Sequence, residues 1–258
     1  MTKDAKKFLA YVAAGILALS ILGVILSSIG SFGPVVGDNK TYEVTGEIKT
    51  LEVEISAADF RIEEGDKFLV ESNLKKLTFK QSGDKLVLKE RSSGNKNYNN
   101  ASLVIYVPEG TVFENVDITT GAGRFSADAL LAEKLDLEFG AGEVNIGELT
   151  ATREADIESG AGQITIKGGS LNNLSLEMGV GELNLTSSIT GRSELDLGVG
   201  EANINLLGTI DDYTVEMTKG IGSLTFDGEI LSSGKKVGTG DSKIGINGGI
   251  GQITISFK

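Results

Sequence analysis

The chain of 258 residues contains no cysteine, histidine or tryptophan and has two prolines. Without histidine and cysteine it cannot build a Ser-His-Asp triad, a Cys-His nucleophile pair, a zinc finger, an iron–sulfur cluster or the usual haem ligation. The absence of cysteine also excludes disulfides and a lipid-modified N-terminal cysteine, so packing must supply the stability. Among common catalytic designs, paired carboxylates remain available.

Basic residues are also scarce, since 24 Lys and Arg stand against 36 Asp and Glu, a formal net charge of −12. Such a surface repels phosphate backbones and anionic headgroups, so we expect no nucleic-acid partner and no broad electrostatic docking on lipid. Glycine is abundant instead, with 35 residues. That is about twice its usual share of roughly 7%, and the placement of these glycines needs a physical reason.

The first organised feature is an uncharged apolar run of 22 residues at positions 8–29. A helix of this length spans roughly 33 Å, enough to cross a bilayer core of about 30 Å. The run therefore predicts a transmembrane helix that anchors the chain in a membrane. Under the positive-inside rule, basic residues in the 1–7 tail place the N-terminus in the cytoplasm and the rest outside; these are Lys3, Lys6 and Lys7.

A cleaved secretion signal is the competing interpretation of the same run, with Ser28 and Gly30 as small residues before a cut. Signal h-regions usually have about 7–15 residues, which favours the uncleaved anchor. Both interpretations export the same domain. Residues 30–41 are Gly-rich, contain Pro34 and show no periodicity, so we predict a linker there.

The second organised feature is a Gly-x-Gly triplet that recurs every 19 to 29 residues, with first glycines at 121, 140, 160, 179, 198, 220 and 249. A near-constant period indicates a stacked, one-dimensional architecture. Apolar residues alternate with polar ones before and after each triplet, as in LDLEFGAGEVNI. That alternation is the strand period, so each copy predicts two short strands joined at a glycine corner. A less regular apolar position suggests a third side: Leu130, Leu149, Leu171, Ile189 and Ile210.

These patterns predict an all-β fold, a parallel β-solenoid (a single-stranded β-helix) of about seven coils over residues 114–258. The residue between the two glycines is always apolar and is expected to point inward: Ala122, Ala141, Ala161, Val180, Val199, Ile221 and Ile250. A dinucleotide-binding loop would need a third glycine and a helix after the triplet, whereas a strand pattern follows each copy.

Residues 42–113 repeat the pattern in a degenerate form, with Ser56-Ala57-Ala58 in place of Gly-x-Gly. We predict that this section caps one end of the solenoid, since open sheet edges need protection. The last strand, 252–257, ends the chain without an obvious cap. A partner or a second copy could cover that edge by strand addition.

The apolar N-terminal segment, the degenerate strand section and tandem units such as LSLEMGVGELNL resemble the bacterial putative-adhesin β-strand-repeat family over roughly residues 45–258. That family includes the membrane-anchored accessory protein of the Lia cell-envelope stress operon. The resemblance implies a β-solenoid displayed on a bacterial membrane, with no established catalytic residues. Its motif is a packing motif, so no functional residue is carried over to this chain.

The outward positions of the predicted coils form rows rich in carboxylates. Counted from the first glycine, position −2 carries Thr119, Glu138, Glu158, Glu177, Asp196, Thr218 and Asn247. Position −4 carries Asp117, Asp136, Asp156, Ser175, Glu194, Glu216 and Gly245. Position +3 offers Glu143, Gln163, Glu182 and Glu201, and position +5 carries Ser126, Asn145, Thr165, Asn184, Asn203, Thr225 and Thr254.

Carboxylates stacked about 4.8 Å apart repel one another unless cations or lysines compensate. The rows indicate either a face for divalent cations or basic ligands, or a soluble face that prevents edge aggregation, and the second is favoured. The calcium-binding nonapeptide of β-rolls is absent, and the Asn/Thr row predicts side-chain ladders. We assign no catalytic, cofactor-binding or metal-ligating residue, and no cofactor.

Three functional hypotheses follow. The favoured one is a non-catalytic interaction or cell-envelope maintenance module, associated with envelope stress, that meets a protein or envelope ligand. The second is an adhesin-like surface protein that binds glycans or proteins. The third, a β-helix polysaccharide-degrading enzyme, would need a cleft walled by long loops, and the one long excursion, residues 227–243, carries no acid–base constellation.

Overall fold

The computed structural model describes residues 33–90 and 96–258. This part of the protein is all-β, with one short 3₁₀ turn. The strands are β1 (Gly33–Pro34), β2 (Val36–Glu43), β3 (Thr50–Gly65), β4 (Leu69–Leu74), β5 (Leu77–Ser82), β6 (Lys85–Glu90), β7 (Lys96–Asn97), β8 (Ser102–Pro108), β9 (Val112–Ile166), β10 (Gly169–Asn172), β11 (Leu174–Thr190), β12 (Arg192–Leu206), β13 (Tyr213–Phe226), β14 (Glu229–Ile230), β15 (Lys235–Val237) and β16 (Ser242–Phe257), and the 3₁₀ turn is η1 (Ile210–Asp212).

No helix within these two ranges is long and apolar enough to span a bilayer. The predicted cytoplasmic tail at 1–7 and the predicted membrane helix at 8–29 lie outside the described residues.

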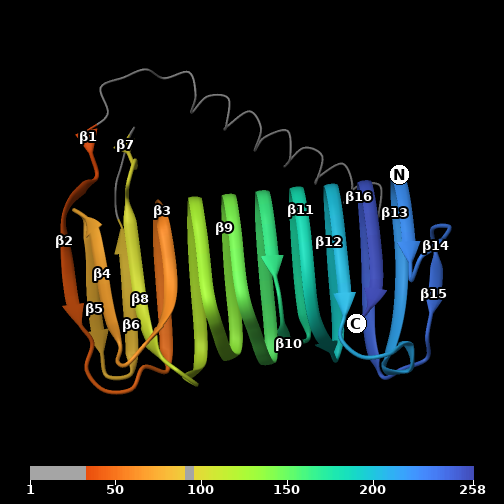
Figure 1. Cartoon of the computed structure of the whole chain (residues 1–258), viewed down its shortest axis with the longest axis horizontal. Helices are drawn as coiled ribbons and strands as arrows, with labels where there is room; N and C mark the ends of the chain where they lie inside the picture. The colour runs from red at the N-terminus through yellow and green to blue at the C-terminus, as the bar shows by residue number, and fades with distance from the viewer. Residues whose placement is uncertain (1–32, 91–95) are drawn as a thin grey trace.

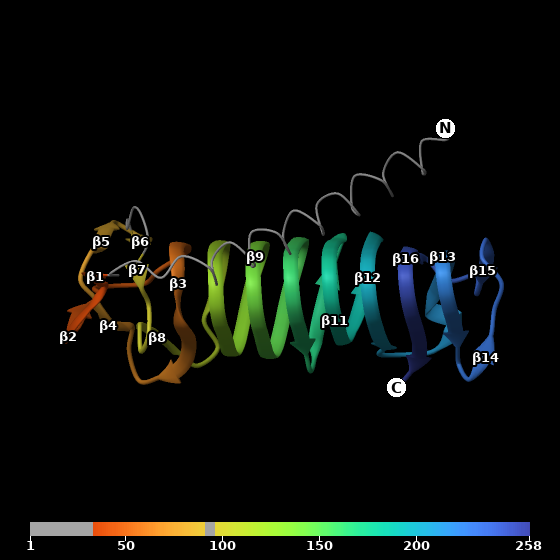
Figure 2. The same cartoon turned by 90° about the horizontal axis from the view of Figure 1, so that it is seen from above.

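The long strands wind as coils that stack side by side in parallel (Figure 1). Equivalent positions lie in register: Gly181 pairs with Gly162 on one side and with Gly200 on the other. The stack is therefore a β-solenoid in which each Gly-x-Gly copy contributes one coil. A third side runs through β9, β10 and β11, where Leu171 pairs with Ile189. Figure 2 shows the coils as an open spiral from above.

The order of the coils departs from the order of the sequence at the C-terminal end. The final strand, β16, lies between β12 and β13, with Ile250 paired to both Val199 and Ile221. The prediction that strand 252–257 leaves an uncapped edge was therefore wrong. The 227–243 excursion is what permits this arrangement, because it carries the chain past the end of β13 and back into the position beside β12.

β13 is consequently the last coil, and the 227–243 excursion covers much of its outer edge. β14 pairs antiparallel with Thr225 and Phe226, and β15 pairs antiparallel with residues 215–217. Between these two short strands, the Ser233 hydroxyl accepts a hydrogen bond from the Lys219 N–H at 2.9 Å and donates one to the Lys219 carbonyl at 3.2 Å. A loop thus protects the edge that a solenoid must close.

The N-terminal end is closed by a different device. β3 is itself a coil, paired with the first turn of β9 through register partners such as Ala57 and Ala122. Its outer edge is divided between β6 and β8, and β5, β4 and β2 continue from these as antiparallel strands. Glu90, only 5% exposed, accepts a 3.4 Å hydrogen bond from the Ser56 N–H and so covers the corner itself.

One sequence-based boundary changes here. Residues 36–41, predicted as part of a linker, belong to strand β2, which pairs antiparallel with β4. The segment has no alternating apolar pattern because it is an edge strand with mostly exposed side chains. Its order therefore comes from backbone pairing with β4, which composition does not reveal.

The glycines are explained by how closely successive corners approach. At the first position of the triplet, a Cβ on Gly198 would lie 2.2 Å from the carbonyl oxygen of Gly179. At the second position, Gly200 has φ +145°, and its Cβ would lie 1.8 Å from the oxygen of Gly181. Positive φ is thus needed only at the second glycine, while the first is required by contact with the preceding coil.

The alternating apolar positions form the core as predicted. Residues −5, −3 and −1 are buried in the copies that carry Leu135, Leu137 and Phe139, and the +4 and +6 positions, such as Val144 and Ile146, are buried as well. The residue between the glycines was predicted wrongly, because it lies on the outside. In the bends that contain Phe139 and Met178, the side chain at position −1 is buried beneath the corner, and the residue at the apex points away from the core.

Candidate functional site

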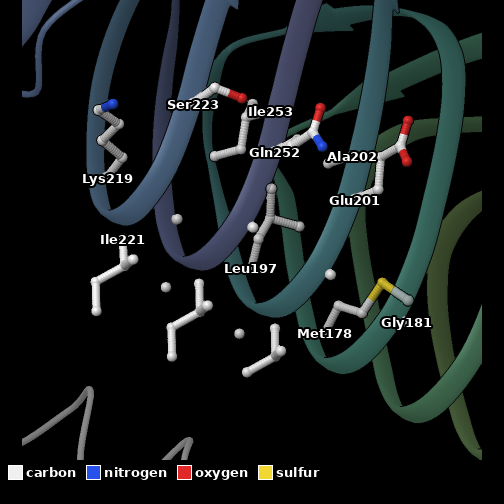
Figure 3. Close-up of a pocket in the computed structure, with 17 residues that line it drawn as sticks. Met178, Gly181, Leu197, Glu201, Ala202, Lys219, Ile221, Ser223, Gln252 and Ile253 are labelled. Carbon is white, nitrogen blue, oxygen red and sulfur yellow. The ribbon is translucent and has the colours of Figure 1, made fainter.

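The outward-pointing corner residues of the last four coils form an apolar ridge. We use this term for Val180, Val199, Ile250 and Ile221, which follow one another in register across β11, β12, β16 and β13. Val199 is 36% exposed, Ile250 37% and Ile221 70%. Figure 3 shows the Ile221 side chain directed away from the ribbon into open space. Contiguous exposed apolar side chains of this kind mark interaction surfaces more often than isolated ones do.

The flanks of the apolar ridge leave its side chains accessible. Columns of glycine run along both sides, and a shallow hollow around the ridge is lined by Gly198, Gly200 and residues 248–253 (Figure 3). Lys219 lies beside the last ridge residue, and its ammonium donates a 2.6 Å hydrogen bond to the Gly222 carbonyl. The site is therefore a raised apolar line with a backbone floor on either side.

The first three corners of the repeat carry alanine in the same position. Ala122, Ala141 and Ala161 lie in line with the apolar ridge across β9. The side chain at the corner thus grows from methyl to isopropyl to sec-butyl toward the end of the stack. This gradient was visible in the sequence, but the inward assignment of these residues concealed it.

The carboxylate rows are stacked as predicted, and their two ends are compensated. At the N-terminal end, the Lys85 ammonium lies 2.7 Å from the Glu52 carboxylate, and Lys89 forms a further ion pair with Glu52. Toward the other end, the Asn247 amide donates hydrogen bonds to Glu194 at 3.1 Å and to Asp196 at 2.8 Å. Ion pairs with lysine and hydrogen bonds from asparagine therefore stabilise the carboxylates at these two ends.

The middle of the rows lacks such compensation. Burial raises the pKa of Asp136, and the neighbouring carboxylates of Asp117 and Asp156 raise it further. Burial and the nearby carboxylates of Asp156 and Glu177 likewise raise the pKa of Glu158. Beside this region, a groove of about 400 Å³ runs along the corner, with Glu138, Glu158 and Glu177 on its wall and glycines on its floor. Like-charge proximity is the defining feature of this face.

Across residues 33–90 and 96–258, no three His, Cys, Asp or Glu side chains gather in a way that would hold a metal ion. The row at position +5 forms one ladder bond between coils, from the Asn203 amide to the Asn184 oxygen at 3.1 Å. Other amides of the row bond within their own coil, as Asn184 does to Glu182 at 2.6 Å. Within the described residues, the predicted ladder is thus present at one step, and elsewhere the asparagine amides donate to the carboxylates at position +3.

A polar cavity of about 390 Å³ lies where the third side of the stack ends. Its lining includes Ser188, Thr190, Asp211, Asp241 and Ser242, beside the buried Tyr213, whose hydroxyl donates a 2.6 Å hydrogen bond to the Leu207 carbonyl. Strand segment 188–190 pairs with β10 on one side. Sequence reasoning missed this cavity because it forms only when β16 and the 227–243 excursion fold back past β12.

The solved structures that match this chain share little sequence with it. A putative adhesin from Bacteroides fragilis has 12% identity over 84% of this chain and 96% of that chain, with a TM-score of 0.48. A putative cell adhesion protein from Clostridium sporogenes has 14% identity over 86% and 99%, with a TM-score of 0.39. A putative lipid binding protein from Parabacteroides distasonis has 14% identity over 87% and 99%, with a TM-score of 0.36.

No curated protein matches the chain. The profile of one family, by contrast, matches residues 44–247, which span β3 to β15 and every glycine corner except the one at residues 249–251. The chain belongs to the Toastrack DUF4097 family.

Proposed function

We propose that this protein is a single-pass membrane protein whose β-solenoid stands outside the cytoplasmic membrane and acts as a non-catalytic interaction module of the cell envelope. The apolar run at 8–29, preceded by lysines, supports the anchor and its orientation. The resemblance to the membrane-anchored Lia accessory protein supports a role in envelope maintenance or stress.

The observation that carries the interaction role is the apolar ridge. Its side chains contribute little to the core, since Ile221 is 70% exposed. Corners of the same geometry form with alanine in this position, at Ala122, Ala141 and Ala161. Exposed valine and isoleucine therefore add association-prone surface that the coil itself does not need.

Two measurements on the full chain expressed in bacterial cells test this proposal. Protease added to intact spheroplasts should digest the solenoid while sparing a tag placed before Lys3. The detergent-extracted chain should migrate in a complex larger than itself, and I221N/I250N should lose that complex while V112N keeps it. Val112 is the matched control, because it is 54% exposed and lies away from the ridge. A protected solenoid, or equal behaviour of all three proteins, would contradict the proposal.

An adhesin-like role in glycan binding is the second candidate, and the polar cavity favours it. Hydroxyls and carboxylates of Ser188, Thr190, Asp211 and Asp241 line a space of about 390 Å³, within the 300–1,000 Å³ typical of small-ligand sites. Titration with soluble cell-wall oligosaccharides should perturb the amide resonances of Ser188 and Thr190. Unchanged resonances at millimolar oligosaccharide would remove this candidate.

A further inference from the structure

The apolar ridge has a polarity along the stack that bears on what it can dock against. Its order is Val180, Val199, Ile250 and Ile221, fixed by the strand register. The flanks change character in the same direction. The coils of Val180 and Val199 carry acidic flanks, whereas those of Ile250 and Ile221 carry neutral or basic ones. One half of the ridge therefore has acidic flanks, and the other half has none.

We propose that the apolar ridge docks against the ridge of a second copy of this chain in antiparallel orientation. This inference rests on the proposed function and names the partner. A two-fold axis through the midpoint between Val199 and Ile250 sets each of these residues against the other in the second copy, and sets Ile221 against Val180. Such an interface is isologous, because the same surface is used by both copies.

The antiparallel orientation resolves the charge problem that self-association poses for an acidic protein. Reversal places every acidic flank opposite a non-acidic one. By strand register, the opposed pairs are Thr218 with Glu177, Ser223 with Glu182, Asn247 with Asp196, and Gln252 with Glu201. Like charges directly opposed would cost affinity, so this arrangement favours the partner being a reversed copy.

The glycine columns supply the shape. On both sides of the ridge the surface falls to the backbone at Gly198 and Gly200. The two ridges can therefore approach until their own side chains meet, because no side chain of the glycine columns holds the two surfaces apart. Close contact between the two ridges excludes water from their apolar side chains.

The proposed contact between the two ridges is small, so we expect it to be populated only when both copies are anchored in one membrane. Four ridge residues and their flanks are fewer than the roughly 20–30 residues that each partner contributes to a stable interface, so free molecules would associate weakly. Anchoring in a membrane raises the local concentration and converts a weak contact into a populated one. If the two-fold axis is perpendicular to the bilayer, both stacks lie parallel to the membrane surface. The N-terminal ends of the two stacks then point in opposite directions but lie at the same height above one membrane.

The absence of native cysteine permits a direct test by disulfide trapping. Full-length V180C and I221C chains carrying different tags are reconstituted together in phosphatidylcholine vesicles and oxidised with copper phenanthroline. We expect a heterodimer at least tenfold more abundant than that from V112C mixed with I221C. I221C alone should not cross-link, since its two copies lie about three coil spacings apart, roughly 14 Å, beyond the Cα separation of about 7 Å that a disulfide tolerates.

Each alternative outcome overturns the proposal in a distinct way. Efficient homodimers of I221C would show a parallel or end-to-end contact. Equal trapping with V112C would show random collision. The absence of all cross-links would exclude a second copy as the partner while leaving an interaction role with another molecule intact. I250K introduced into both partners of the V180C and I221C mixture should abolish trapping, and an unchanged melting temperature of that variant shows that the coils remain folded.

Discussion

The stacked carboxylates predict that removing a charge from the middle of the rows stabilises the protein. Asp136 is accessible to solvent, and partial burial of its carboxyl, together with the Asp117 and Asp156 carboxylates beside it, raises its pKa. At the strand spacing of about 4.8 Å, each neighbour repels it by about 0.9 kcal/mol in water. A Debye length of about 8 Å at physiological salt lowers each repulsion to roughly 0.5 kcal/mol. D136N therefore removes about 1 kcal/mol of repulsion from its two neighbours.

The assay is equilibrium unfolding in urea of the full chain in mild detergent, with D66N as the matched control. Asp66 is equally exposed and lies in a turn outside the carboxylate rows. D136N should raise the free energy of unfolding by about 1 kcal/mol, or the melting temperature by roughly 2–4 °C. In 1 M salt, where the Debye length falls to about 3 Å, most of the gain should disappear.

The pH dependence supplies a second check with a defined sign. Because the pKa of Asp136 is raised above 3.8 in the folded state, its repulsion is present at neutral pH and is relieved as pH falls through that folded pKa. The advantage of D136N should therefore vanish in acid. A D136N protein no more stable than wild type at low salt, or a gain equal to that of D66N, would refute the like-charge argument.

Three further outcomes are expected. E52Q should lower the free energy of unfolding by about 0.5–1 kcal/mol at neutral pH, because it breaks the ion pairs with Lys85 and Lys89. The hydrogen bonds from these lysines lower the pKa of Glu52 below 4.5. In urea titrations, the difference between E52Q and wild type should therefore fade as the pH drops through that folded pKa. G200A should lower the free energy of unfolding by about 3 kcal/mol or more, because its Cβ would lie 1.8 Å from the Gly181 oxygen at φ +145°. A141V, which changes an outward corner residue, should alter the free energy of unfolding by no more than about 0.5 kcal/mol in the same assay. E90A should cost about 1–2 kcal/mol and speed hydrogen exchange at the Ser56 amide, which donates to Glu90 at 3.4 Å; exposed E109A is the control, and unchanged exchange would mean that Glu90 does not close the corner.

The repeat itself can be predicted from the sequence. The Gly-x-Gly period and the alternation of residues such as Leu135 and Leu137 specify two strands per coil with a shared core, because strand periodicity follows from backbone geometry alone. The acidic rows followed from the same register. The local pattern was sufficient to predict the strands and the outward rows wherever one coil packs against a similar coil.

Two features depended on tertiary structure. Whether Val199 and Ile221 face the core or the solvent is decided by the path of the backbone through each bend, which the alternating pattern does not specify. The placement of β16 between β12 and β13 is decided by long-range pairing. All coils carry the same backbone pattern, so the sequence alone does not specify which neighbour a strand chooses.

The sequence by itself determined an all-β repeat with glycine corners, since each requirement lies within a single coil or between two like coils. Only the tertiary structure decided the apolar ridge, the polar cavity and the loop-covered end. These depend on which coil is last, and that depends on the free energy of closing the 227–243 excursion and on the pairing it makes available. The surfaces on which a partner could act were therefore the part that composition and spacing did not fix.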